Sequence, residues 1–361
     1  MAEGPKVLFL TKYARKGASS RYRTFQFLPY LEAAGFRCTV SPLFDDSYLA
    51  HKYSSGRARW RDVVGAFGGR LRAILGSRRF DLVVIEKELL PYSPALLERL
   101  LGWAGVPYVV DYDDALFHQY DRHPRPWVRW LLGRKIARVM RGAALVTAGN
   151  EYLAGYARRA GAPRVEVLPT VVDLDRYPAP AGPGGNAVFT IGWIGSPTTA
   201  QYLEKIAPAL ARVCADGQAR VRLIGSGKVD LPGVPHEVIP WREGEEAEQL
   251  RAMDVGIMPL PDTPWERGKC GFKLIQYMAC GLPVVASPVG VNADIVEDGI
   301  NGYLAGDEEA WVAALNRLKG EPERRQEFGK AGRSKVEGEY SLEVTAPRFA
   351  RLLWEQCSDS P

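Results

Sequence analysis

Short apolar runs alternate with amphipathic stretches along the chain, and this alternation predicts the fold class. Residues 6–10, Lys-Val-Leu-Phe-Leu, form a first buried strand. Further strands are predicted at 38–40, 81–85, 106–111, 143–147 and 165–169, and helices at 21–34, 57–76, 92–103 and 150–160. Apolar strands that alternate with helices are typical of a parallel, doubly wound α/β sheet.

A proline- and glycine-rich stretch at 178–186 is the best candidate for a domain boundary. Beyond it the pattern restarts, with strands predicted at 189–195, 220–225, 255–260 and 284–286. Helices are predicted at 199–214, 245–253, 307–319, 321–338 and 341–356. Two doubly wound domains of similar size bind ligand in the crevice between them, at the carboxyl ends of the strands.

The segment 265–286 carries the strongest chemical signal. It predicts a glycine-broken loop, a short helix that ends at Gly281, and a buried strand. The start of a helix presents free backbone N–H groups and the positive end of the helix dipole, which together favour phosphate. Lys269 and Lys273 lie one turn apart at that start, and we expect them to share one helical face. The segment therefore predicts a diphosphate site.

Two sequence runs carry a family resemblance: Met-Ala-Cys-Gly-Leu-Pro-Val-Val-Ala at 278–286 and Glu-Asp-Gly-Ile-Asn-Gly-Tyr-Leu at 297–304. At this spacing they resemble the nucleotide-sugar site of retaining glycosyltransferases of family 4. The resemblance implies the GT-B fold, in which two Rossmann-like domains face a central cleft. It implies an acceptor domain at 1–180, a nucleotide-sugar domain at 187–340, and a final segment, 341–361, whose helix crosses back to the N-terminal domain.

The chain departs from the family at two motif positions. Family members usually carry two glutamates eight positions apart, where this chain has Gly268 and Gln276. Glu266 lies two residues before the first of them. Gln276 remains a predicted donor contact, because an amide makes similar hydrogen bonds without charge. The sugar contact of the first glutamate is then expected from the backbone N–H groups of Cys270, Gly271 and Phe272.

Loops of the second domain are expected, by the same resemblance, to hold the rest of the donor. The predicted residues are Gly195, Ser196, Gly225, Gly227, Lys228 and Trp241. Many family members bind the diphosphate with an arginine and a lysine near 196–199, where this chain has Ser and Thr. The cationic role therefore falls to Lys269 and Lys273, with Arg267 in reserve. The structural alternatives are a helix cap at 196–199, an ordinary turn at 225–228 and a buried Trp241.

Acidic residues end the predicted fourth strand: Asp111, Asp113 and Asp114, with His118 nearby. Ionised groups resist burial unless paired, so this group fits acceptor binding, proton handling or a metal. Asp113 falls closest to a histidine of family 4 enzymes and is the predicted catalytic residue beside Lys269 and Lys273. The alternative is a surface loop in which Asp114 caps the next helix.

The loop after the first strand is the other predicted acceptor element, with Gly17, Ser19, Ser20, Arg21 and Arg23. Its small residues allow close backbone approach, and its arginines are suited to bidentate binding of phosphate or carboxylate. The resemblance places the matching loop of GT-B enzymes near the donor phosphates or the acceptor. The alternative is a helix N-cap at Ser19 or Ser20 with arginines on the solvent face.

The distribution of charge is a further informative feature. The net charge of +5 over 361 residues is unevenly spread. Two basic clusters, at 57–79 and 122–141, lie in the N-terminal half and include Trp60, Trp127 and Trp130. Basic residues interleaved with Trp suit a membrane surface better than nucleic acid; the alternative is a solvated helix face. Five scattered cysteines and no apolar run of bilayer length indicate a cytoplasmic protein with possible membrane association.

The resemblance implies transfer of a sugar, with retention of configuration, from a UDP- or GDP-type nucleotide sugar. The expected acceptor is a glycan, a lipid-linked sugar or a small molecule, in cell-envelope polysaccharide or glycolipid synthesis. No metal or other cofactor is expected to be required, and no nucleic acid partner. The alternatives are a non-catalytic nucleotide-sugar-binding subunit and a GT-B enzyme of small-molecule biosynthesis. A Rossmann dehydrogenase is disfavoured, because no GxGxxG follows the first strand.

Overall fold

The structure, a computed structural model, describes residues 4–48, 60–103, 105–179 and 186–358. It divides into two compact units, each made of separate chain segments. Unit 1 contains Met1–Thr170, Gly268–Cys270 and Thr345–Pro361, and unit 2 contains Val171–Arg267 and Gly271–Val344. The first change of unit thus comes ahead of the predicted linker at 178–186, of which 180–185 lie outside the described residues.

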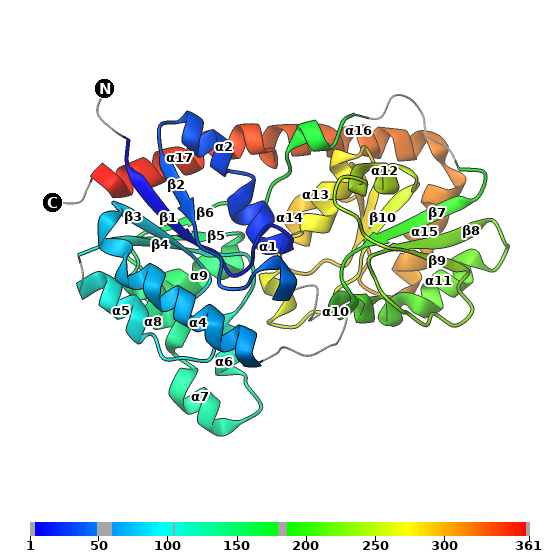
Figure 1. Cartoon of the computed structure of the whole chain (residues 1–361). Helices are drawn as coiled ribbons and strands as arrows, with labels where there is room; N and C mark the ends of the chain where they lie inside the picture. Colours follow the sequence, from blue (N-terminus) through cyan, green and yellow to red (C-terminus); the bar gives the residue numbers. More distant parts are fainter. Residues whose placement is uncertain (1–3, 49–59, 104, 180–185, 359–361) are drawn as a thin grey trace. The chain divides into compact units, whose positions relative to one another are not determined.

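Unit 1 is built on a six-stranded parallel sheet in the order β2-β1-β3-β4-β5-β6 (Figure 1). Its strands are β1 (Lys6–Leu10), β2 (Arg37–Val40), β3 (Leu82–Glu86), β4 (Tyr108–Tyr112), β5 (Leu145–Ala148) and β6 (Val165–Val167). The chain leaves β1 toward β2 and then resumes on the other side with β3. That reversal makes the sheet doubly wound and creates a switch point between β1 and β3, where ligands of such sheets bind.

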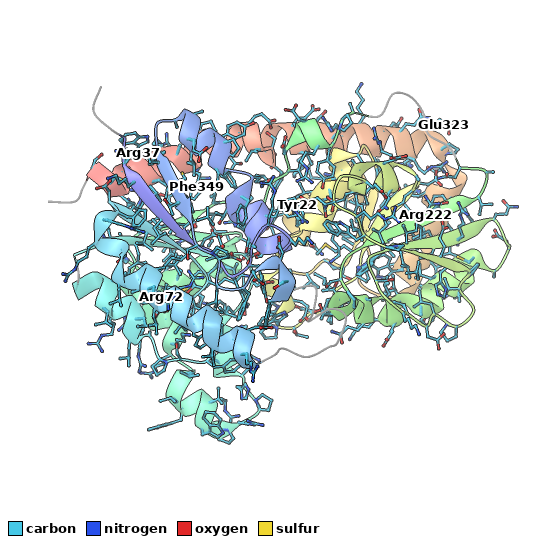
Figure 2. The ribbon with its side chains drawn as sticks, viewed as in Figure 1. Tyr22, Arg37, Arg72, Arg222, Glu323 and Phe349 are labelled. Carbon is cyan, nitrogen blue, oxygen red and sulfur yellow. The ribbon has the colours of Figure 1, made fainter. Side chains whose placement is uncertain are left out.

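Helices cover both faces of this sheet. They are α1 (Ala18–Ser20), the π-helix η1 (Arg21–Phe25), α2 (Leu28–Ala33), α4 (Trp60–Leu75), η2 (Ser77–Arg79), α5 (Leu96–Trp103), α6 (Phe117–Asp121), α7 (Pro126–Leu132), α8 (Lys135–Gly142), α9 (Glu151–Arg159) and α17 (Leu342–Ser358). Alternate strand residues such as Val83 and Val110 share one buried cluster with Ile74 of α4 and Val139 of α8. Phe349 of α17 (labelled in Figure 2) packs edge-on against Phe27, with ring centroids 5.2 Å apart.

Several boundaries in unit 1 differ from the prediction, among them those of two helices and one strand. The single helix expected at 21–34 is three short segments, α1, η1 and α2. The helix expected from Tyr92 starts at Leu96, because Tyr92 has a left-handed φ of 55°. The strand expected from Val106 starts at Tyr108, since Pro107 has no N–H to donate to a neighbouring strand.

Unit 2 is a second six-stranded parallel sheet, in the order β12-β11-β10-β7-β8-β9. Its strands are β7 (Phe189–Ile194), β8 (Ala219–Ile224), β9 (His236–Ile239), β10 (Val255–Met258), β11 (Val284–Ala286) and β12 (Gly302–Leu304). The chain reverses between β7 and β10, which gives this sheet its own switch point. The prediction of two doubly wound parallel sheets is confirmed.

The helical elements of unit 2 are η3 (Leu174–Arg176), α10 (Pro197–Ala200), η4 (Gln201–Ile206), α11 (Ala207–Cys214), α12 (Glu246–Arg251), η5 (Glu266–Gly268, whose last residue belongs to unit 1), α13 (Phe272–Ala279), α14 (Asn292–Ile295), α15 (Glu308–Gly320) and α16 (Pro322–Glu339). Leu210 and Leu315 pack with Ile191 on one face of the sheet, and Leu274 and Val336 pack on the other. The helix predicted at 199–214 is interrupted by the 3-10 segment η4.

The motif segment follows its prediction closely at its C-terminal end. Helix α13 is followed by Gly281 with a left-handed φ of 72°, and Leu282 N–H donates to the carbonyl of Tyr277. This six-to-one hydrogen bond is the glycine-terminated helix end that the sequence predicted. In the described part of the chain, no helix combines the length and apolar character needed to cross a bilayer.

Candidate functional site

A charged cluster lies at the switch point of unit 1. Lys87, the residue after β3, is buried and has a left-handed φ of 65°. Its Nζ lies 2.8 Å from Oδ1 of Asp113 and 3.7 Å from Oδ2 of Asp114, and it donates to Oγ of Ser19 over 3.0 Å. A non-glycine residue in this conformation costs about 1 kcal/mol, which these contacts offset.

Asp113 is the centre of this cluster. Burial alone would raise the pKa of its carboxyl group, but the charge of Lys87 and hydrogen bonds from Lys87 and Ser19 outweigh it and lower the pKa below its usual value. For Lys87, burial opposes the charged form, yet Asp113 and Asp114 raise the pKa above its ordinary value. Both groups are therefore charged at neutral pH and hold each other in place.

Arg23 and Asp111 form a second pair beneath the cluster. The guanidinium binds the carboxylate with two nitrogens, one of them Nε at 2.9 Å from Oδ2. Thr147 donates to the same carboxylate over 2.6 Å, and Arg23 also donates to the carbonyl of Leu168 over 2.7 Å. Because both partners are buried, this pair fixes the π-helix η1 to the ends of β4 and β5.

The serines of the first loop turn toward carboxylates. Ser19 donates to Asp113, and Ser20 donates to Oε2 of Glu86 over 2.6 Å. The structural alternative for this loop was an N-cap by Ser19 or Ser20. The N-cap residue of α1 is Gly17, and Ser20 is at the N-cap of η1, but neither makes a side-chain cap hydrogen bond. A Cβ on Gly17 would lie 2.4 Å from Cβ of Tyr13, so glycine is needed there.

Lys269 joins the unit 1 cluster instead of the motif helix. Its Nζ lies 2.8 Å from Oδ1 of Asp114, and its carbonyl accepts from Nδ2 of Asn150 over 2.9 Å. Helix α13 begins only at Phe272, so the expectation that Lys269 and Lys273 share a helical face is wrong. The capping alternative for Asp114 is also wrong, because α6 has Leu116 at its N-cap.

Two further predicted residues lie in unit 1, Cys270 and His118. Cys270 lies in its core, with Sγ 3.1 Å from the carbonyl oxygen of Asp113, and burial raises the pKa of the thiol. His118 has Nδ1 2.9 Å from Asp121 and Nε2 2.8 Å from the hydroxyl of Tyr152. Both ring nitrogens of His118 are thus engaged by side chains of α6 and α9.

In unit 2, the first turn of α13 lies beside the end of β7. Gly271, the N-cap residue, has a left-handed φ of 64°, and a Cβ there would lie 2.2 Å from Cδ1 of Ile295. The Nζ of Lys273 lies 5.3 Å from the ring centroid of buried Trp193. This cation and the helix N-terminus therefore meet at the switch point of the second sheet.

Two glycine loops follow β7 and β8, and a Cβ on Gly195 of the first loop would lie 2.4 Å from the ring of Trp193, which Lys273 also contacts. Gly225 has a φ of 72°, and a Cβ on it would lie 2.5 Å from the carbonyl oxygen of Gly195. Gly227 has a φ of 67°, and a Cβ on it would lie 3.2 Å from Cγ of Pro197. Ser196 and Thr199 form a capping box on α10, so the predicted cap at 196–199 is present. Lys228 is exposed at the end of the second loop.

Gln276 is part of a buried network. Its Nε2 donates to the hydroxyl of Tyr177 over 2.9 Å and to Oε1 of Glu246 over 2.8 Å. Glu246 also accepts from Tyr177 and, over 2.6 Å, from Nε1 of Trp241. A carboxylate thus lies next to the motif position that Gln276 occupies, but it belongs to Glu246 of α12.

Glu266 and Arg267, the two residues before Gly268, are also held by side-chain contacts. Glu266 is buried and accepts from the hydroxyl of Tyr202 over 2.6 Å and from Thr263. Arg267 is exposed and binds Asp262 with Nε and Nη2, at 2.6 and 2.9 Å. Among the described residues, no group of three or more His, Cys, Asp or Glu side chains is arranged to hold a metal ion.

Comparison with known proteins now decides the family. A family model described as "Glycosyl transferase 4-like domain" matches residues 6–170, and one described as "Glycosyl transferases group 1" matches 188–320. The two models together account for most of the chain. The chain belongs to glycosyltransferase family 4. Its two doubly wound sheets are those of the GT-B fold.

Curated relatives of this family 4 glycosyltransferase include the sulfoquinovosyl transferase SQD2 of Arabidopsis thaliana, 32% identical over 162 residues. That match covers 42% of this chain and 30% of the plant protein. The alpha-maltose-1-phosphate synthase of Mycolicibacterium smegmatis is 32% identical over 214 residues, covering 49% of this chain and 53% of its own. The chain therefore spans between about a third and about half of these relatives.

Solved structures show the same fold at low identity. A sucrose-phosphate synthase from Thermosynechococcus elongatus superposes with a TM-score of 0.72 at 16% identity, covering 99% of this chain and all of that one. Anabaena HepE in complex with UDP-glucose superposes with a TM-score of 0.73 at 16% identity, covering 97% of this chain and all of HepE.

Sequence reasoning missed three residues of the glycosyltransferase's candidate site: Lys87, Glu246 and Tyr177. A signal for Lys87 was present, because Glu86-Lys87-Glu88 is a charged run directly after a buried strand. Charged side chains there face the carboxyl edge of the sheet. No local signal marks Glu246 or Tyr177, since their proximity to Gln276 arises from three separate elements of unit 2.

Proposed function

We propose that this glycosyltransferase transfers a sugar, with retention of configuration, from a UDP- or GDP-type nucleotide sugar. The observation that carries the proposal is the meeting of the α13 N-terminus, Lys273 and the Gly195 and Gly225 loops at one switch point of unit 2. Backbone N–H groups and a cation at such a point suit a diphosphate. HepE, of the same fold, was solved with UDP-glucose and with UDP and glucose.

The proposed chemistry follows from charge. When the bond between the sugar and the diphosphate breaks, negative charge grows on the leaving diphosphate oxygen. The dipole of α13 and the ammonium of Lys273 stabilise that charge more in the transition state than in the ground state. In this proposal no metal is required, and backbone N–H groups at Cys270, Gly271 and Phe272 contribute at the same place.

Unit 1 provides the proposed acceptor contacts. The side chains of Lys87 and Asp113 are 9% and 14% exposed, whereas those of Asp114 and Lys269 are 27% and 21% exposed. The Asp114–Lys269 pair is thus the part of the cluster that an acceptor hydroxyl reaches first. Asp113 and Lys87 set its position and charge from below. We propose a glycan, lipid-linked or small-molecule acceptor, in cell-envelope polysaccharide or glycolipid synthesis.

One observation favours a second function, a nucleotide-sugar-binding subunit without transfer activity. The two motif glutamates of the family are replaced here by Gly268 and Gln276. Incubation with the donor separates the two functions. A transferase releases nucleoside diphosphate, slowly even without acceptor, whereas a binding subunit returns the donor intact.

The main test is a thermal-shift screen of UDP-, GDP-, ADP-, CDP- and dTDP-sugars. One nucleotide at about a hundredfold excess over Kd is expected to raise Tm by about 5–10 °C. Lys273→Ala should abolish most of that shift. Lys330→Ala, an exposed lysine of α16 in the same unit, is the matched control and should keep it. If no nucleotide sugar shifts the wild-type Tm, the donor proposal fails.

A further inference from the structure

Helix α7 carries large apolar side chains on its outer side. Trp130 is 86% exposed, Trp127 57% and Leu131 42%, and all three lie within five residues of one short helix. Positions i, i+3 and i+4 of a helix share a face, so these side chains form one apolar surface. Val128 and Leu132 point the other way into the core of unit 1. Figure 1 shows α7 projecting beyond α8 within its unit.

Other described elements of unit 1 also carry exposed apolar side chains. They are Val64, Leu71 and Leu75 of α4, Leu96 and Leu100 of α5, and Tyr92 just before α5. These helices lie on the same side of the sheet as α7, since Ile74, Leu101 and Val128 belong to one buried cluster. Tyr92 also contacts His123, with ring centroids 6.2 Å apart. The three side chains on the outer face of α7 are the contiguous part of this exposed apolar surface, and contiguous apolar surface marks an interaction site.

The segment that contains α7 carries charge of one sign. From Arg122 to Asn150 the sequence contains no Asp or Glu but has six arginines and one lysine. Lys135 is buried against Glu88, whereas all six arginines are exposed: Arg122, Arg125, Arg129, Arg134, Arg138 and Arg141. The guanidinium of Arg129 donates to the carbonyls of His123 and Pro124, which fixes the loop before α7.

We propose that α7 docks this protein on an anionic lipid bilayer. Trp127, Trp130 and Leu131 enter the interface between headgroups and acyl chains, and the surrounding arginines bind lipid phosphates. Tryptophan prefers this interface because its ring is apolar and its N–H is polar. A run of like charges calls for an extended negative surface, which anionic lipid supplies.

Charge complementarity also argues against a second copy of the chain as the occupant. Two identical arginine-rich faces repel each other when they meet across a two-fold axis. The inference goes beyond the proposed function, because lipid docking is independent of the donor and of the chemistry at Asp113 and Lys273. Each can therefore fail without the other.

The test is co-flotation of the full chain with vesicles of pure phosphatidylcholine, and with vesicles of equal parts phosphatidylcholine and phosphatidylglycerol. Binding is expected only to the anionic vesicles and should weaken steeply as salt rises. The double variant Trp127→Ala/Trp130→Ala should bind at least about tenfold more weakly, given the apolar area of two rings. Ile300→Ala, 55% exposed in unit 2, is the control and should bind like the wild type.

A second measurement tests directly whether the indole ring of Trp130 enters the bilayer. Brominated phosphatidylcholine, mixed with phosphatidylglycerol, should quench tryptophan fluorescence of the wild type more than that of Trp130→Phe, which keeps an aromatic ring. Equal quenching would place Trp130 outside the bilayer and overturn the proposal. So would anionic-vesicle binding that the double variant retains. Duplex DNA that displaces the vesicles, and whose own binding is lost in the double variant, would make nucleic acid the partner instead.

Discussion

The Nζ atom of Lys87 lies 2.8 Å from Oδ1 of Asp113, although the two residues follow different strands and are 26 positions apart. Lys87 reaches this position only because its backbone is left-handed, with a φ of 65°. Both side chains are nearly excluded from water, at 9% and 14% exposure. The pair links β3, β4 and the loop after β1 through one shared contact, the hydroxyl of Ser19.

The two charges of this pair should stabilise the protein in a coupled way. Lys87→Met and Asp113→Asn each leave one buried charge without its main partner, and each should lower the free energy of unfolding by about 3–5 kcal/mol. The double variant should lose about 1–3 kcal/mol less than the sum of the two. Urea denaturation of the four proteins measures this coupling. Additive losses would mean that the two charges do not depend on each other.

Acid should destabilise the wild type through Asp113. Because the folded-state pKa of this carboxyl lies below its unfolded value, its contribution is present above the unfolded pKa and is lost as pH falls through the folded pKa. Stability should therefore drop from about pH 5 downward. Lys87→Met/Asp113→Asn should show a shallower drop. Parallel pH profiles for the two proteins would assign the acid sensitivity to other groups.

Restoring the motif glutamate should be harmful in this chain. Gln276→Glu brings a second carboxylate to within hydrogen-bond distance of Glu246 in a buried site. One of the two carboxyls must then keep a proton, so its folded-state pKa rises. Stability is retained below the unfolded pKa of about 4.3 and lost as pH rises; at pH 7 we expect a loss of roughly 2–4 kcal/mol.

The charge swap provides the matched control. Glu246→Gln/Gln276→Glu keeps one carboxylate and one amide in the network and should recover most of the stability at pH 7. It should also remove the added pH dependence. Urea denaturation at pH 4.5 and pH 7 distinguishes these outcomes. A single Gln276→Glu variant as stable as the wild type at both pH values would contradict this account of the Glu246 network.

The N-cap of α13 should tolerate no side chain. Gly271→Ala adds the strain of a left-handed alanine, about 1 kcal/mol, to the overlap of its Cβ with Ile295, about 1–3 kcal/mol. Gly217→Ala is the control, because Gly217 has a similar φ of 73° but nothing within 4 Å of the added Cβ. It should show the strain alone. Thermal denaturation compares the stability of the two variants. Equal losses of stability would show that Ile295 moves aside without an energetic cost.

The five cysteines should react slowly with a disulfide reagent at pH 8. Burial raises the pKa of Cys214 and Cys357 to about 11 and that of Cys38 and Cys280 to about 12, and raises that of Cys270 further. Thiolate, which is the reactive form, should be at least about a hundredfold scarcer than in a free cysteine. Urea should restore rapid labelling. Rapid labelling of Cys270 in the native protein would show that its site opens.

Continuous apolar runs made the two sheets predictable. Residues 6–10 and 284–286 have the predicted bounds, because a buried parallel strand needs apolar side chains on both faces. The π-helix at Arg21–Phe25 was not predictable in the same way. Arg23 of this helix binds Asp111, and Ser20, the residue before it, donates to Glu86. Both partners are distant in sequence, so no local pattern indicates the π-helix.

The candidate site was predictable where the chemistry lies in one segment. Gly271, Lys273 and Gly281 follow from local glycine and lysine positions, whereas Lys269 was misplaced because the sequence does not show that α13 starts at Phe272. Lys87 escaped prediction for a related reason. Its left-handed backbone is stabilised by contacts with Asp113, Asp114 and Ser19, and no neighbour in sequence signals it.

The division of the chain among the units has a consequence for its synthesis. Thr345–Pro361 completes unit 1 after all of unit 2 has been made. At ribosomal rates of about 5–20 residues per second, Phe27 and Phe36 wait roughly 10 to 35 seconds after Thr170 for Phe349 and Trp354, their aromatic partners. During that interval the apolar surface beside α2 is open on a nascent chain, which makes it a natural binding place for a chaperone.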